Sequence, residues 1–87
     1  MGQHKRKEVG LRVRRIHGHV QAITEMLEEG RPYPEIVHQV SAVKAALDGV
    51  IRVIVDDLVE DCVAKKERKE QFEDSLLQLQ EVVGKLR

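Results

Sequence analysis

The sequence predicts an all-α protein with three helices, in which the first two form an antiparallel hairpin and the third is short. Apolar residues recur in steps of three and four along most of the chain, which is the spacing of one helix face. No segment shows the strict alternation of a half-buried strand. The only two prolines, Pro32 and Pro34, stand together and separate the two longest periodic segments. Eighty-seven residues make one domain, near the lower size limit for a self-sufficient core.

The first helix is expected to begin between Lys5 and Val9 and to end before Gly30. Its apolar stripe consists of Val13, Ile16, Val20, Ile23 and Leu27. Gly30 suits the left-handed position just past a helix end, and Pro34 suits the first turn of the next helix. The short connection between these residues predicts an antiparallel hairpin.

The second helix occupies residues 35–62 and is expected to run to about Lys65. Its stripe consists of Ile36, Val40, Val43, Leu47, Val50 and Ile54. Such a helix is on the order of 40 Å long, and a chain of this size cannot cover both of its faces, so we expect a second copy and a four-helix core. Neither Gly nor Pro marks the end of this helix between residues 64 and 70. The third helix carries Phe72, Leu76, Leu79, Val83 and Leu86 on one face.

The charges sum to zero but are unevenly distributed along the chain. Residues 1–8 read as a flexible basic tail, and further cations follow at Arg12, Arg14 and Arg15. A basic segment on a neutral protein is typical of a polyanion partner. Arg12 and Arg15 share a helix face, and Lys44 lies on the polar side of the second helix. Because aromatic residues are absent there, the pattern favours duplex phosphate contacts over base stacking, with a merely solvated face as the alternative.

The sequence contains no sign of enzymatic chemistry. The glycines are scattered through helical segments and form no phosphate-binding loop. Ser41 and Ser75 lie within helical patterns that set no His and carboxylate around them. Asp57 and Asp61 share a face at a spacing of four, which more often marks a solvated surface than a catalytic pair. We therefore expect a protein that is not an enzyme.

Metal ligands cannot be identified from spacing alone. His17 and His19 are two positions apart and point to different helix faces, and no CxxC or HxxxH pair occurs. The single cysteine, Cys62, is either a small buried apolar residue or a reactive thiolate, and its neighbours do not decide between the two. A lone cysteine excludes an internal disulfide and fits a reducing, cytoplasmic location. No run is long and apolar enough for a membrane span.

Four segments in this order resemble the CsoR/RcnR/FrmR family of bacterial repressors. They are RVRRIHGHV at residues 12–20, MLEEGR at 26–31, QVSAVKAAL at 39–47, and Cys62 with Val63. The resemblance covers nearly the whole chain and implies an all-helical dimer, a dimer-of-dimers tetramer, and operator DNA that is released when an effector binds. It also implies DNA contacts by Arg12, Arg14, Arg15 and Lys44.

The sensing residues of the family are largely replaced. The resemblance places an effector pocket at Tyr33, Leu58 and Cys62, where the copper sensors have Cys, His and Cys. Only Cys62 is retained, so a trigonal Cu(I) site is not available. His4 resembles an N-terminal histidine of the nickel sensors. Cys62 and His4 are therefore the candidate ligands for a transition metal ion, and the alternative is a helical interaction module or constitutive DNA binder that has lost sensing.

Overall fold

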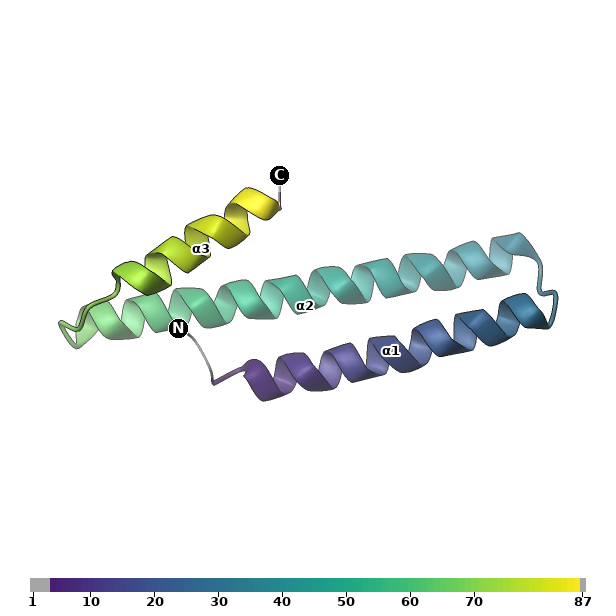
Figure 1. The fold of residues 1–87 in the computed structure, drawn as a ribbon, viewed down its shortest axis with the longest axis horizontal. Helices are drawn as coiled ribbons and strands as arrows, with labels where there is room; N and C mark the ends of the chain where they lie inside the picture. Colours follow the sequence, from purple (N-terminus) through teal and green to yellow (C-terminus); the bar gives the residue numbers. More distant parts are fainter. Residues whose placement is uncertain (1–3, 87) are drawn as a thin grey trace.

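The computed structural model describes residues 4–86, which form three helices and no strand (Figure 1). Helix α1 spans Arg6–Glu28, α2 spans Tyr33–Glu67 and α3 spans Glu73–Lys85. Helices α1 and α2 lie side by side and antiparallel, and α3 folds back along the end of α2. The molecule is a thin rod of 58 × 26 × 13 Å. The predicted hairpin and short third helix are confirmed. Among these residues, no helix could span a membrane.

The buried residues between α1 and α2, together with the half-buried Val9, recur every seven positions. This seam consists of Val9, Ile16 and Ile23 on α1, and of Ile36, Val43, Val50 and Asp57 on α2. A seven-residue period keeps one face of each helix against its partner, as in a coiled coil. The fourth position of the α2 series is a carboxylate, Asp57, which is 5% exposed. The apolar seam therefore ends at the last turns of α2.

The other half of each predicted stripe is uncovered in a single chain. This outer row consists of Val13, Val20, Leu27, Val40 and Leu47, each between 45% and 50% exposed. Its members follow the seam residues by four positions and also recur every seven residues. One half of each predicted stripe therefore packs between α1 and α2. The outer row, which is the other half, packs against no other part of the described chain.

Both long helices end in the same hydrogen-bonded turn, the Schellman motif. After α1, Gly30 N–H donates to the Leu27 carbonyl at 3.1 Å, and Arg31 N–H donates to the Met26 carbonyl at 3.0 Å. Gly30 has φ of 73°, which confirms its predicted left-handed position. Helix α2 then begins with Pro34 in its first turn, also as predicted.

After α2, the left-handed residue is Lys69, with φ of 59°. Lys69 N–H donates to the Lys66 carbonyl at 3.1 Å, and Glu70 N–H donates to the Lys65 carbonyl at 2.8 Å. Helix α2 therefore ends at Glu67, within residues 64–70, where the sequence did not define the helix end.

The apolar face of α3 is not the face that packs against α2. The residues on the inner side are Ser75, Gln78, Leu79 and Val82, while Leu76, Val83 and Leu86 are exposed. Of the predicted face, only Phe72 and Leu79 are half-buried. Ser75, on the inner side, makes a polar contact with α2 that is described below. At the other end of the chain, α1 begins at Arg6, so residues 6–8 of the predicted tail are helical, and residues 1–3 lie outside the described part.

Candidate functional site

The predicted DNA-contacting residues lie along the middle of the hairpin. Arg14, Arg15 and Lys44 are exposed, whereas Arg12 is half-buried. The Arg12 guanidinium reaches from α1 toward α2, where its Nη1 lies 3.5 Å from the point that a Cβ on Gly49 would occupy. Its Nη2 lies 3.4 Å from the Glu8 carboxylate. Four cations thus stand on two antiparallel helices, with Arg12 held more firmly than the others.

The three residues of the predicted effector pocket do not meet within one chain. Tyr33 is the first residue of α2 and is 77% exposed. Leu58 lies twenty-five residues further along the same helix, which corresponds to about 37 Å at 1.5 Å per residue. Leu58 is buried and Cys62, a free thiol, is half-buried. The structure brings Leu58 and Cys62 to the end where all three helices come together, and leaves Tyr33 at the other end.

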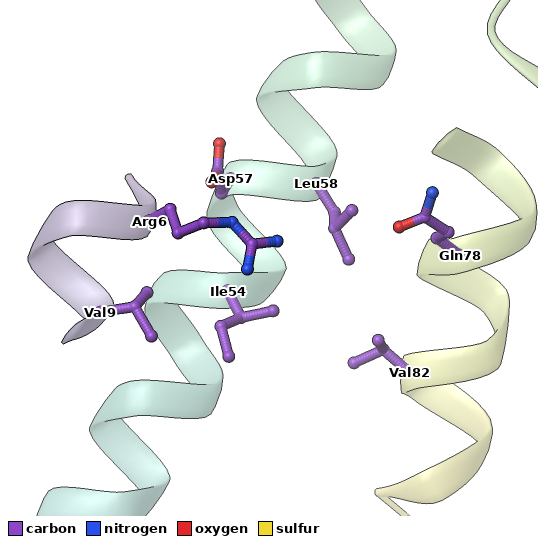
Figure 2. Close-up of a pocket in the computed structure, with 7 residues that line it drawn as sticks. All are labelled: Arg6, Val9, Ile54, Asp57, Leu58, Gln78 and Val82. Atoms are coloured by element: carbon purple, nitrogen blue, oxygen red, sulfur yellow. The ribbon is translucent and has the colours of Figure 1, made fainter. Parts of the chain in front are cut away.

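A cavity of about 190 Å³ lies at this end, between α1, α2 and α3 (Figure 2). It is lined by Arg6, Val9, Ile54, Asp57, Leu58, Gln78 and Val82. Four of these side chains are aliphatic. In Figure 2 the Arg6 guanidinium extends past Asp57 toward the space between α2 and α3, which Gln78 and Val82 face from the other side. Of the predicted pocket residues, Leu58 lines this cavity, while Tyr33 and Cys62 do not.

The residues before α1 bind the acidic end of α2 in an N-terminal clasp made by His4, Lys5, Asp57 and Glu60. Lys5 Nζ donates to the Glu60 carboxylate at 2.8 Å, and Lys5 N–H donates to Asp57 Oδ2 at 3.3 Å. The two ring nitrogens of His4 lie 2.8 Å from Asp57 Oδ1 and 2.7 Å from Glu60 Oε2. The hydrogen bonds from Lys5 and then His4 hold the pKa of Glu60 below its ordinary value. The clasp covers the carboxylate that ends the seam.

A second polar cluster, the Ser75 anchor, fixes α3 to α2 and consists of Ser75, Asp61 and Lys65. Ser75 is fully buried, and its hydroxyl donates a short hydrogen bond to Asp61. The same oxygen accepts from Lys65 Nζ at 3.1 Å, and Lys65 lies 3.3 Å from Asp61. The hydrogen bond from Ser75 lowers the pKa of Asp61, and Lys65 adds to that effect.

The Ser75 anchor places a carboxylate and a lysine beside Ser75, which the local sequence pattern did not indicate. Its partners are fourteen and ten residues away in sequence, across a turn that contains neither Gly nor Pro, so local pattern could not find them. A fully buried hydroxyl cannot reach a substrate. The cluster therefore has a structural role, and Cys62 follows directly after one of its members.

No group of three His, Cys, Asp or Glu side chains within residues 4–86 is arranged to hold a metal ion. His4 is engaged by two carboxylates, and Cys62 is not part of any such cluster. His19 Nε2 lies 2.7 Å from the Gln39 amide oxygen, which links α1 to α2 near the hairpin turn. His17 and His38 are exposed.

Comparison with known proteins gives a consistent result. A family model described as "Metal-sensitive transcriptional repressor" matches residues 5–86. The copper-sensing transcriptional repressor CsoR of Bacillus subtilis is 31% identical over 81 residues, which are 93% of this chain and 80% of that protein. The copper-sensing transcriptional repressor RicR of Mycobacterium tuberculosis is 35% identical over 54 residues, 62% of this chain and 56% of that protein. The solved structure of the nickel-responsive transcriptional regulator InrS has a TM-score of 0.80 and 33% identity, and the match covers 100% of this chain and 97% of that one.

Proposed function

Because the chain belongs to the family of metal-sensitive transcriptional repressors, we propose that it represses transcription by binding operator DNA, from which a small effector releases it. Members of this family are repressors, which confirms the prediction that the chain is not an enzyme. Its partners are then double-stranded DNA and further copies of itself, and its location is the cytoplasm.

The observation that carries the DNA proposal is the set of cations in the middle of the hairpin. Arg14, Arg15 and Lys44 are exposed, and Arg12 is held between the two helices. Arginine and lysine side chains that contact backbone phosphates contribute affinity without carrying sequence information. With no helix-turn-helix among residues 4–86, sequence preference would come from groove shape and DNA deformability.

The outer row supports assembly with further copies of the chain. Five half-exposed aliphatic residues on two antiparallel helices form an apolar surface that a monomer leaves in water. Packing this surface against that of a second hairpin gives a four-helix core, and pairing of such dimers gives a tetramer. An antiparallel arrangement of two α2 helices would also bring Tyr33 of one copy to the Leu58 and Cys62 end of another, which completes the predicted effector pocket.

The sensing chemistry of this chain differs from that of the copper sensors it resembles. Tyr33 supplies a phenol, Leu58 supplies no donor, and Cys62 supplies one thiolate. Cu(I) prefers two or three soft ligands, so these residues do not form a site for that ion. We therefore propose an altered effector, and no ligand set is carried over from the relatives.

The DNA proposal can be tested by electrophoretic shift on the promoter region of the chain's own gene at several salt concentrations. We expect binding to weaken as salt rises, and the double substitution Arg12→Ala with Arg15→Ala to lower the slope by about one for each phosphate that the variant no longer neutralises. The matched control removes two exposed cations elsewhere, Lys66→Ala with Lys85→Ala. Equal binding by the two double variants, or binding that ignores salt, would refute the proposed interface.

The second candidate function is a constitutive DNA binder or helical interaction module, which Leu58 at a sensing position favours. Competition with a chelator across a series of metal ions separates the two candidates. Tight binding that Cys62→Ala abolishes supports a metal sensor with a new ligand set. The absence of metal binding, together with DNA affinity that no added effector changes, supports the constitutive binder.

A further inference from the structure

We propose that Gly49 is a positioning residue for DNA binding and acts through Arg12. Because Gly49 has no side chain, the Arg12 guanidinium of α1 lies directly against α2, where it is restrained before any phosphate binds. Gly49 itself contacts no DNA. The inference rests on the DNA binding proposed above for its effect on affinity, whereas the placement of Arg12 is a property of the free protein.

Gly49 stands near the middle of α2, the longest helix. Glycine in a helix interior is less favourable than alanine, because it loses more backbone freedom on folding and adds no side chain to the packing. The backbone of α2 does not require a glycine there, since the helix is continuous over Tyr33–Glu67 and Gly49 does not have a positive φ. The reason for this glycine therefore lies outside the helix.

The side chain of Arg12 provides such a reason. Of the five glycines among residues 4–86, Gly49 alone has an atom within 4 Å of the place that a Cβ would occupy, namely Arg12 Nη1 at 3.5 Å. Gly10, Gly18 and Gly84 are also helical, and open space lies where their Cβ atoms would be. Gly49 is thus distinguished from the other helical glycines by the arginine that lies across it.

The two helices of the hairpin hold the Arg12 guanidinium between them. Nη1 lies beside Gly49 on α2, and Nη2 lies 3.4 Å from the carboxylate of Glu8, one turn earlier on α1. The ion pair with Glu8 is exposed and contributes little by itself. Arg12 is nevertheless half-buried, whereas Arg14 and Arg15 are exposed. Of these three arginines, Arg12 is the one that the fold restrains most.

Restraint of Arg12 in the free protein favours a phosphate contact. An arginine side chain has several rotatable bonds, whose freedom is lost when the guanidinium is fixed on a phosphate. A side chain that is already restrained loses less freedom, so the same contact gives a higher affinity. The charge is the same in either case, so restraint raises the affinity without changing the number of phosphates that are neutralised.

The distance of 3.5 Å limits how large residue 49 can become. A Cβ at that distance makes ordinary van der Waals contact with Arg12 Nη1, so Gly49→Ala should keep the guanidinium in place. Valine and isoleucine branch at Cβ and fill two of the three staggered positions beyond it, next to the guanidinium. Gly49→Val and Gly49→Ile should therefore push Arg12 away from α2. The helix itself tolerates all three changes, because these residues are better helix formers than glycine.

The placement of Arg12 is tested on the full chain without DNA, by NMR relaxation of its Nε–H group. We expect the order parameter in Gly49→Ala to match the wild type, and to fall in Gly49→Val and Gly49→Ile toward the values of flexible groups, below about 0.6. The control Gly84→Ile makes the same change where no arginine lies and should leave Arg12 unaffected. Equal order parameters throughout the series overturn the proposal, and the valine variant decides the matter if Gly49→Ile does not fold.

Electrophoretic shift then measures the effect on DNA. Gly49→Ile should weaken binding roughly two- to tenfold and keep the salt slope of the wild type, whereas Arg12→Ala also lowers that slope by about one. Added to Arg12→Ala, the Gly49→Ile change should have no further effect, because the side chain through which it acts is gone. An equal loss in that background, or with Gly84→Ile, would show that the substitution acts on folding or on DNA directly and would overturn the proposal.

The two measurements separate this proposal from the repressor function. A chain that never binds DNA, and whose Arg12 loosens in Gly49→Ile, refutes the proposed function and retains the placement of Arg12 by Gly49. Salt-dependent DNA binding that Gly49→Ile leaves unchanged overturns the role of Gly49 and leaves the repressor proposal intact.

Discussion

The two turns of the molecule use the same hydrogen bonds with different residues. The turn after α1 places Gly30 in the left-handed region, which a residue without a Cβ adopts without steric cost. The turn after α2 places Lys69 there, with φ of 59°. A left-handed conformation costs a residue with a Cβ roughly 1–2 kcal/mol. The first turn is therefore stable by itself, whereas the second depends on contacts outside it.

The Ser75 anchor supplies such contacts for the second turn. It joins α3 to α2 through a buried hydroxyl and two charged side chains. Arg68 adds a bond from its Nε to the Glu70 carboxylate at 2.9 Å, but this pair is exposed and contributes little. The hairpin is thus encoded locally, and the position of α3 is encoded by tertiary contacts.

The largest effect is expected from breaking the anchor. Asp61→Asn removes the charge that accepts from Ser75 and Lys65, and should lower the free energy of unfolding by about 2 kcal/mol, measured by urea denaturation at fixed protein concentration. The control Asp56→Asn, an exposed carboxylate on the same helix, should change it far less. If the two variants are equally stable, the anchor does not hold α3.

The same pair of variants carries a pH dependence with a definite sign. The pKa of Asp61 is lowered in the folded chain, first by the Ser75 hydrogen bond. The group therefore stabilises the fold fully above its unfolded pKa, near 3.8, and this contribution is lost as pH falls from there through the lower folded pKa. The stability difference between wild type and Asp61→Asn should accordingly shrink below about pH 4. A difference that grows with acidity would contradict the lowered pKa.

The first turn can be broken by Gly30→Ala. A Cβ at this position meets no atom within 4 Å, so the expected loss of about 1–2 kcal/mol comes from the backbone conformation alone. Thermal unfolding should begin earlier, by roughly 4–8 °C for each kcal/mol in a domain of this size. Gly84→Ala on α3 serves as the control, because it lies in a helix with equally open space and should be neutral or stabilising.

The second turn can be stabilised by Lys69→Gly, which is expected to have the smallest effect on stability of the three substitutions. Relief of the left-handed lysine should stabilise the chain by about 0.5–1 kcal/mol, after the greater freedom of glycine in the unfolded chain is deducted. Opposite signs for the substitutions at residues 30 and 69, measured in the same thermal experiment, would show that both turns favour a residue without a Cβ at the left-handed position. A destabilising Lys69→Gly would show instead that the lysine side chain contributes contacts of its own.

The fold could be predicted from sequence because its strongest signals are local. The Gly30 turn, the proline pair and the periodic stripes indicated the hairpin of the first two helices and the presence of a third helix. The stripes could not show which half of each would be buried, because Val40 and Val43 are equally apolar and only the partner helix distinguishes them. The sequence likewise could not show which face of α3 packs against α2, because that face contains the buried serine Ser75, whose partners lie on another helix.

The candidate site was predictable only in part. Composition indicated the cations on α1, and the family resemblance singled out Leu58 as an unusual residue at a sensing position. The cavity beside Leu58 brings together Arg6, Asp57 and Val82, which are far apart in the chain. The spacing of Asp57 and Asp61 predicted a solvated face and hence a solvated carboxylate at Asp57. In the structure, Asp57 instead occupies the fourth position of the α2 seam and is buried beneath the N-terminal clasp.

The unbroken course of α2 has a consequence for how residues far apart on it are oriented relative to one another. Lys44 and Leu58 are fourteen residues apart on one continuous helix, so their angular phase about its axis is fixed by the count of residues between them. Inserting one residue between them would rotate Leu58 about the helix axis by about 100° relative to Lys44. Inserting seven would rotate it by only about 20° and would add about 10 Å to the distance between the two residues. Inserting a single residue into α2 would therefore point Leu58 in a different direction relative to Lys44, whereas inserting seven would nearly preserve their relative direction.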